Sequence, residues 1–304
     1  MTASNAEWQR RKEAAIARGQ GNIAPVYIDR AVNAEMWDVE GKRYIDFGTG
    51  IAVCSTGHLH PRVTAAVQRQ LQRFSHTCVM VTPYDSAVML AEQLNELAPG
   101  DSPKKSIFVT TGAEAVENSV KIARAHTGRR GVIAFGGGFH GRTLLAMGLT
   151  GKITPYKNLF GPFPAEIYHA PFPIDYHGVG IDDALQAIDD LFKVDIAPTD
   201  VAAIIVEPVQ GEGGFYPAPV EFLQALRAAQ AQREVLAAWP SHPCLSGLPA
   251  HAGGAAGADR AGAGGLRLLE AVAHLGQEPA PAASSGGDGA AGHRRARGHR
   301  PGGG

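Results

Sequence analysis

The sequence predicts an α/β fold, built on a mostly parallel sheet with helices on both of its faces. Three apolar runs of strand length, SIFVT, GVIAF and VAAIIV, alternate along the chain with stretches of helical periodicity. Continuous apolar strands are typical of parallel sheets covered on both sides, and the alternation is typical of crossover connections. With 304 residues, 44% of them hydrophobic, the chain is long and apolar enough to bury such a core.

The part that precedes this alternation has a different organisation. In chain order, we expect an amphipathic helix at residues 5–18, a hairpin at 36–47, and helices at 61–74 and 86–97. The hairpin is expected because two alternating runs flank a Glu-Gly turn. The two later helices carry apolar residues at helical spacing; a proline opens the first and a Pro-Gly pair follows the second.

The alternating part is expected to run from residue 106 to about residue 229. In chain order, the expected elements are a strand at 106–110, a helix at 113–126, a strand at 131–135, a helix from Gly141, a helix at 182–192, a strand at 201–206 and a helix at 219–229.

The charge balance and the cysteines exclude several classes of protein. Lys and Arg number 28 and Asp and Glu 29, so the net charge is −1 and no nucleic-acid or membrane-surface binding through bulk charge is expected. Three scattered cysteines form neither a disulfide framework nor a metal-binding pattern, so no metal site is expected. No apolar run approaches the length of a membrane span and no secretory signal is recognised, so we expect a cytoplasmic location.

The composition changes abruptly near residue 229. Residues 229–304 contain no Lys, Phe, Tyr, Ile, Met, Asn or Thr, but they hold 16 of the 38 glycines. Such a segment cannot bury enough apolar surface to offset the entropy of ordering it, so a disordered tail is expected. The expected domains are therefore residues 1–58 (N-terminal helix and hairpin), 59–228 (the α/β domain) and 229–304 (the tail).

Two glycine-containing segments follow the first two expected strands. Gly112 and Ala113 begin a helix, whose free N–H groups and dipole favour a phosphate; an ordinary strand–helix turn is the alternative. After the next strand, three glycines precede Phe139, which could lie against a flat ligand, and Arg142 could bind a carboxylate with two hydrogen bonds. A flexible loop with a buried phenylalanine and a solvated arginine is the alternative there.

A third segment, EPVQGEGG, follows the buried run VAAIIV. Its first acid, Glu207, comes directly after the strand, where ligands gather in open parallel sheets. Glu207 and Glu212 together suit recognition of a cationic group, and a solvated loop with two exposed acids is the alternative.

Together these segments are far more specific than any one of them. The texts DVEGKRYIDF, GIAVCSTGHLHPRV, TTGAEAVENSVKIARA, FHGRT, GLTGK and EPVQGEGGFYPAP occur in the order and at the spacing of the class III (ω-)aminotransferases, which they resemble over roughly residues 5–228. The resemblance implies an incomplete large domain of the pyridoxal-phosphate-dependent fold type I. It also implies pyridoxal 5′-phosphate as the cofactor. It is strongest to the bacterial members that act on 4-aminobutyrate.

The resemblance implies five cofactor-binding positions. Backbone N–H groups of Gly112 and Ala113 would hold the phosphate, and Phe139 would stack on the pyridine ring. His140 would support the loop that carries Phe139, and Glu207 would lie near the cofactor and the substrate amine.

It implies three substrate-binding positions as well. Ile51 would line the pocket, Arg142 would bind the distal carboxylate, and Glu212 would pair with an arginine of the C-terminal domain. The implied reaction transfers an amino group from 4-aminobutyrate to 2-oxoglutarate, giving succinate semialdehyde and glutamate. Another ω-amine or an ornithine-type donor is the alternative substrate class. Intact members are homodimers, whereas this chain lacks the half that would supply much of that contact.

The resemblance stops near residue 228. The family continues into an Asp-Glu-Val-Gln segment that binds the pyridine nitrogen, and later into an Ala-Lys-Ser motif with the Schiff-base lysine; neither is found here. The last lysine of the chain is Lys193, so no catalytic residue is assigned and the chain is expected to be inactive, or to be a non-catalytic remnant. Read one base later, Gly276-Gln-Glu-Pro279 can spell Ala-Lys-Ser-Leu, which suggests an out-of-frame tail; a natural low-complexity tail is the alternative.

Overall fold

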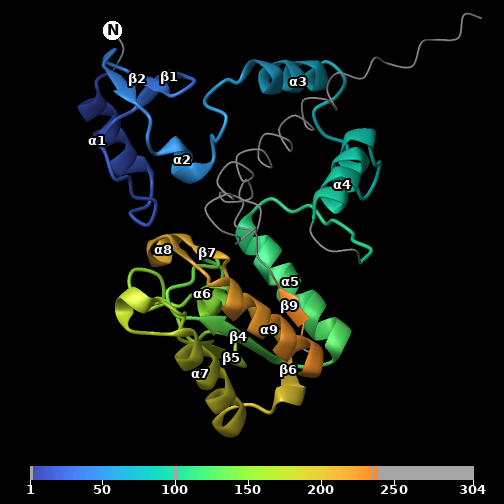
Figure 1. Ribbon diagram of the computed structural model, residues 1–304. Coiled ribbons are helices and arrows are strands. Elements are labelled where there is room, and N and C mark those ends of the chain that lie inside the picture. The colour runs from blue at the N-terminus through green and yellow to red at the C-terminus, as the bar shows by residue number, and fades with distance from the viewer. Residues whose placement is uncertain (1–2, 99–101, 234–235, 239–304) are drawn as a thin grey trace, which may run out of the picture.

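A four-stranded parallel sheet forms the centre of the computed structural model, which describes residues 3–98, 102–233 and 236–238 (Figure 1). Its strands, in the order in which they pair, are β5 (Ile167–Ala170), β4 (Gly131–Phe135), β6 (Val201–Ile205) and β9 (Leu236–Ala238). Every pair of neighbours is parallel. The α/β fold with a mostly parallel sheet is therefore confirmed.

Helices cover both faces of this sheet. The helices on one face are α5 (Gly112–Thr127) and α6 (Leu144–Leu149), and those on the other are α7 (Ile181–Val194) and α9 (Val220–Arg233). All five residues of β4 and of β6 are buried, which explains why both strands read as continuous apolar runs.

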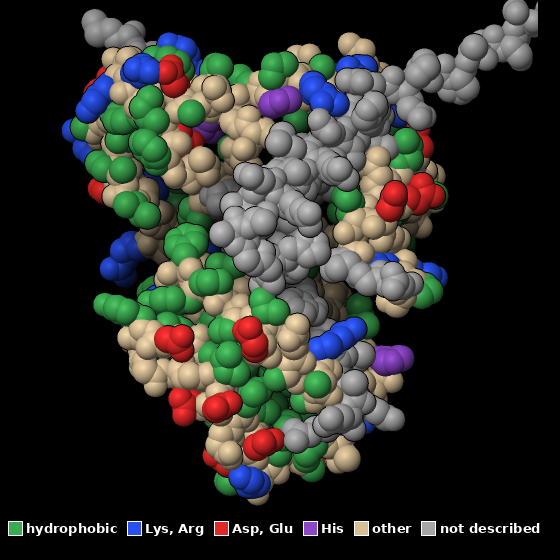
Figure 2. Space-filling model, viewed as in Figure 1, with side chains coloured by type: hydrophobic (Ala, Val, Ile, Leu, Met, Phe, Trp, Pro, Cys, Tyr) green, Lys and Arg blue, Asp and Glu red, His purple; other side chains and the backbone are tan. Residues whose placement is uncertain are grey.

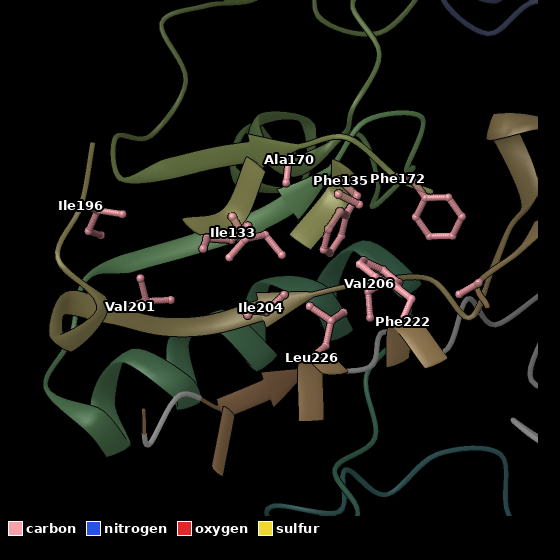
Figure 3. Close-up of a cluster of buried hydrophobic side chains, with 13 residues drawn as sticks. Ile133, Phe135, Ala170, Phe172, Ile196, Val201, Ile204, Val206, Phe222 and Leu226 are labelled. Carbon is pink, nitrogen blue, oxygen red and sulfur yellow. The ribbon is translucent and has the colours of Figure 1, made fainter. Parts of the chain in front are cut away.

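Successive residues of β4 point to opposite helix layers, as the pleat of a strand requires. Val132 and Ala134 pack in the cluster that includes α5 and α6. Ile133 and Phe135 pack in the larger cluster with α7 and α9 (Figure 3). There the rings of Phe135, Phe172 and Phe222 meet edge to face, with centroids 5.5–6.2 Å apart.

The N-terminal part has smaller elements. They are α1 (Asn5–Ala15), β1 (Ile28–Val32), β2 (Glu35–Asp38), β3 (Arg43–Ile45), α2 (Thr49–Ala52), α3 (Pro61–Leu71) and α4 (Asp85–Leu97). The three strands form an antiparallel sheet in chain order, and β2 with β3 is the expected hairpin. The helix expected at residues 5–18 forms over the shorter range of α1, and none of its residues is buried.

Short elements complete the described chain. They are two 3₁₀ turns, η1 (Asp175–His177) and η2 (Pro198–Asp200), the small hairpin β7 (Val209–Gln210) and β8 (Tyr216–Pro217), and α8 (Gly211–Gly214). No helix among the described residues is long and apolar enough to cross a membrane. Hydrophobic side chains also lie at the surface on the face shown in Figure 2.

The strand expected at residues 106–110 is wrong. The segment pairs with no strand among the described residues, and Ile107, Phe108 and Val109 are 65%, 47% and 39% exposed. Its residues have strand propensity, but a strand also needs a neighbour to accept and donate its backbone hydrogen bonds.

Five strands, β1, β5, β7, β8 and β9, are absent from the sequence-based expectations. β9 pairs with β6 beyond the proposed boundary at residue 228, which the helix α9 also crosses. Most of the expected disordered tail, from residue 239 on, lies outside the described residues.

Candidate active site

The carboxyl ends of β4 and β6 form a topological switch point of the sheet, here called the crevice. The strand after β4 in the chain, β5, lies on one side of β4, and the next, β6, lies on its other side. The chain therefore continues from β4 and from β6 into helices of opposite layers, α6 and α9, and ligands bind at such switch points. These loops are residues 136–143 and 206–215, which contain most of the expected site residues.

Gly141 brings the first loop against the start of α5. It has φ +126°, and a Cβ on it would lie 2.7 Å from the Cβ of Ala113, so only glycine allows this approach. The hydroxyl of Thr143 donates a hydrogen bond to Glu117 Oε1 at 2.5 Å, which ties the loop to α5 a second time. The beginning of α5 and the loop after β4 thus form one surface.

The start of α5 is well defined. Thr111 caps the helix: its hydroxyl accepts from the Glu114 N–H at 3.2 Å, and Glu114 Oε2 accepts from the N–H groups of Thr110 and Thr111. This capping box leaves the N–H groups of Gly112 and Ala113, the first of the helix, without a carbonyl partner in their own helix. They are suited to bind an anion.

The loop after β4, residues 136–143, is called the glycine loop. Besides its contact with α5, it packs against Thr150 and Gly151. The buried Thr150 hydroxyl accepts from the His140 N–H at 3.1 Å and donates to Ala146 O at 2.9 Å. Gly151 exchanges backbone hydrogen bonds with Gly137 and Gly138, at 3.1 and 2.8 Å. Thr150 and Gly151 both belong to the GLTGK motif of the sequence, for which no role was expected.

Gln210 fills the space that the glycines leave. Its side chain is buried, and Nε2 donates to Gly136 O at 2.8 Å. A Cβ on Gly137, which has φ +79°, would lie 2.6 Å from Gln210 Oε1. Within the described chain, that oxygen is buried and has no hydrogen-bond partner. The loop after β4 is therefore packed against the loop after β6 by side chain and backbone together.

Glu207 is the buried acid of the site. It is 5% exposed, and its Oε2 accepts from the Phe139 N–H at 3.4 Å. Burial raises the pKa of Glu207 to about 7, the nearby charge of Glu212 raises it too, and the bond from Phe139 partly opposes the shift. A carboxyl group that titrates near neutral pH can hold or release a proton under physiological conditions.

The rings of Phe139 and Tyr156 and the Arg142 guanidinium gather beside it. The two ring centroids are 4.9 Å apart, and Arg142 Cζ lies 5.6 Å from one and 5.9 Å from the other. The Tyr156 hydroxyl donates to Glu212 Oε2 at 2.7 Å. Burial, followed by this carboxylate, raises the pKa of Tyr156 to about 12. Tyr156 is absent from the sequence-based site, because nothing in its local sequence marks it.

The structure brings seven of the eight expected site residues to this crevice. They are Gly112, Ala113, Phe139, His140, Arg142, Glu207 and Glu212. The eighth, Ile51, lies in α2 of the N-terminal part and is 78% exposed.

Comparisons with known proteins agree on one family. The family model for class-III aminotransferases matches residues 15–237. The 5-aminovalerate aminotransferase DavT of Pseudomonas putida is 54% identical over 236 residues, which is 78% of this chain and 56% of that protein. The 4-aminobutyrate aminotransferase GabT of Escherichia coli is 53% identical over 225 residues, 74% of this chain and 53% of that protein. The chain spans about half the length of these relatives.

Solved structures show the same fold. The ornithine aminotransferase of Toxoplasma gondii, whose active site is partially occupied by pyridoxal phosphate, has a TM-score of 0.67 at 27% identity, covering 81% of this chain and 56% of that one. An (S)-enantioselective ω-transaminase of Thermomicrobium roseum has a TM-score of 0.70 at 27% identity, covering 79% and 57%. The family is pyridoxal-phosphate-dependent and uses an amine donor and a keto acid. On its sequence and its fold, this chain belongs to the class III aminotransferases.

Proposed function

We propose that this chain carries the cofactor-binding part of an aminotransferase that moves the amino group of 4-aminobutyrate, or of the one-carbon-longer 5-aminovalerate, to 2-oxoglutarate. One observation carries the proposal: Gly141 packs on Ala113 while the Phe139 N–H bonds to Glu207. The start of α5, the loop after β4 and the loop after β6 therefore meet at one point. The identities of 54% and 53% to enzymes named for these two amines support the substrate class.

The residues at the crevice fit part of pyridoxal phosphate. The N–H groups of Gly112 and Ala113 suit its phosphate, since an anion is stabilised at a helix N-terminus. Gly141 brings the loop after β4 against Ala113 at this helix start, and Phe139 in the same loop offers a ring for a flat group to lie against. When bound, the cofactor supplies an aldehyde that reacts with amines and a ring that delocalises electrons.

The chain's own residues would bind and orient the substrate and hold a proton. Arg142 would bind the carboxylate of the amino acid or of 2-oxoglutarate, a task that suits its planar guanidinium. Glu207, with its pKa near 7, would exchange a proton close to the substrate amine. Glu212 would fix the Tyr156 hydroxyl at the edge of the site. Ile51 would complete the pocket only if α2 approached the crevice.

We propose that a polypeptide of these 304 residues does not catalyse transamination. The last of its lysines is Lys193, which precedes Glu207 and forms an ion pair with Asp190 on the exposed face of α7. No amine therefore follows in the chain where the family has its Schiff-base lysine. This feature favours the second candidate, a non-catalytic protein that binds the cofactor or a partner without transamination.

We further propose that the segment after the family match, which ends at residue 237, is read out of frame. The loss of Lys, Phe, Tyr, Ile and Met after residue 228 supports it. Sequencing the DNA across codons 225–280 tests this directly. A one- or two-base insertion or deletion relative to an intact gene of the family is expected, and an uninterrupted frame shared with close homologous genes contradicts it.

Calorimetric titration with pyridoxamine 5′-phosphate tests cofactor binding. Gly112→Pro removes one N–H at the first position of α5, where proline is tolerated and where the preceding Thr111 is already extended. We expect it to weaken binding by about 1.5–3 kcal/mol, as for a lost hydrogen bond to a charged group. Gly112→Ala is the matched control, because it adds a side chain and keeps the N–H.

Equal binding by the wild type and Gly112→Pro contradicts the phosphate site. A parallel assay of glutamate formation from 4-aminobutyrate and 2-oxoglutarate, with added pyridoxal phosphate, tests turnover. We expect none above background, and turnover typical of an aminotransferase contradicts the proposed inactivity.

A further inference from the structure

One lysine lies in contact with the residues of the crevice. The Lys152 ammonium donates to the backbone carbonyl of Glu212 at 3.5 Å. The carboxylate of Glu212 accepts from Tyr156, whose ring lies 4.9 Å from that of Phe139. Three successive contacts thus connect Lys152 with the ring that would lie against the cofactor. The side chain is exposed, so its amine is accessible to a small molecule in the crevice.

Three of the other lysines have partners outside the crevice. Lys157 donates to Gly148 O at 3.0 Å, at the end of the buried helix α6, and burial lowers its pKa. Lys193 is paired with Asp190 at 2.8 Å on α7. Lys42 lies over the Tyr44 ring in the N-terminal sheet. The chain has eight lysines in all, and none follows Lys193.

Lys152 comes directly after Thr150 and Gly151, the two residues that hold the glycine loop in place. Gly151 is bonded to Gly137 and Gly138, and Thr150 is bonded to His140. The backbone of Lys152 is therefore fixed relative to Phe139, and its side chain extends to the loop after β6, where it contacts Glu212. An amine fixed beside a bound aldehyde reacts at a high effective concentration.

We propose that Lys152 is the residue that captures the aldehyde of pyridoxal 5′-phosphate in this chain. The inference rests on the proposed function, since the phosphate must first bind at Gly112 and Ala113. The deprotonated amine of Lys152 attacks the aldehyde carbon; the nitrogen gives up its two protons, the carbonyl oxygen leaves as water, and a C=N bond forms. Added borohydride, a hydride donor, then reduces this bond, and the nitrogen takes a proton from water.

Mapping the reduced adduct tests the inference. The 304-residue protein is incubated with an equimolar amount of pyridoxal 5′-phosphate, reduced with borohydride, digested and analysed by mass spectrometry. We expect the phosphopyridoxyl group on Lys152 at roughly ten times or more the occupancy of Lys193, because of the local concentration of bound aldehyde. Lys152→Arg abolishes the main adduct, whereas Lys193→Arg, the matched control, leaves it unchanged.

Two further ligands separate this inference from the proposed function. Pyridoxal without its phosphate is expected to lose the preference for Lys152, because the anchor at α5 is not used. Pyridoxamine 5′-phosphate has no aldehyde, so Lys152→Arg is expected to bind it within about twofold of the wild type. If pyridoxamine phosphate fails to bind the wild type, the proposed function is wrong. If it binds and the adduct is spread over several lysines or lies elsewhere, the assignment of Lys152 is wrong.

Discussion

The sheet region from β4 to α9 buries every residue of two central strands, whereas helices α1, α3 and α4 of the N-terminal part bury none of theirs. Both regions hold hydrophobic residues, but in the N-terminal part many lie exposed, among them Phe47 and Met80, each 92% exposed. The site is therefore held rigid by the packing of the sheet region. Seven site residues rest on packing internal to the sheet region, and Ile51, the one in the N-terminal part, is apart from them.

The largest expected contrast is in core substitutions. Phe222→Ala removes a fully buried ring that contacts Phe135 and Phe172, and we expect it to lower the free energy of unfolding by about 3–5 kcal/mol. Leu71→Ala truncates a residue of α3 that is 64% exposed, and a change within about 0.5 kcal/mol is expected. Urea unfolding followed by far-ultraviolet circular dichroism measures both, and equal losses would remove the distinction between the regions.

Alanine substitutions at two glycines, one at the site and one in the N-terminal part, are expected to differ in the same way. A Cβ on Gly151 would collide with backbone atoms of Phe135, Gly136 and Gly137, and backbone cannot move aside as a flexible side chain can. Gly151→Ala is therefore expected to cost roughly 3 kcal/mol, the upper end for overpacking. Gly19→Ala, in the N-terminal part, meets nothing within 4 Å and is expected to be close to neutral. A stable Gly151→Ala chain that still binds pyridoxamine phosphate would contradict the packed loop.

Much of this packing could be predicted from the sequence. The features that could not be predicted depend on contacts between segments far apart in the chain. The strand at β4 was expected at its observed bounds, because its apolar pentapeptide has strand propensity and the strands β5 and β6 pair with it on both sides. Residues 106–110 have the same kind of composition but no strand beside them, and pairing is a non-local property. Phe139 and Glu207 were expected to meet because both follow parallel strands. Tyr156 was missed because a long loop places it.

The pH dependence of stability is expected to have opposite signs in the two regions. Glu207 has a folded pKa of about 7, above its ordinary value of 4.5, so the folded chain binds more protons than the unfolded chain between these values. Its contribution to stability falls as pH rises through that window, by about 3 kcal/mol.

In the N-terminal part the sign is reversed. The hydrogen bond with His58 and then the Thr49 N–H lower the pKa of Asp46, so its contribution is present above its ordinary pKa and is lost as pH falls below it. Urea midpoints measured from pH 3 to pH 8 on Glu207→Gln and Asp46→Asn separate the contributions of the two carboxyl groups to the pH dependence of stability. An unchanged slope between pH 4.5 and 7 in Glu207→Gln would contradict the assignment of that window to Glu207.

The smallest expected effect is spectroscopic. Tyr156 has a pKa raised to about 12, by burial first and by Glu212 next. Glu212→Gln removes the charge that the phenolate would face, so ionisation of Tyr156 should begin at lower pH. Absorbance titration of the phenolate, with Tyr156→Phe as the reference that identifies its signal, measures the shift. An identical titration in Glu212→Gln would show that the 2.7 Å bond does not form in solution.

The sheet region is proposed to bind the cofactor without a contribution from the N-terminal part. Amide hydrogen exchange with and without pyridoxamine 5′-phosphate tests it most directly, because it reports on both regions in one experiment. We expect slower exchange on ligand addition in residues 112–118 and 136–143, and no change in residues 5–15 and 61–71. Unchanged exchange at α5 and the glycine loop, or protection confined to the N-terminal part, would contradict it.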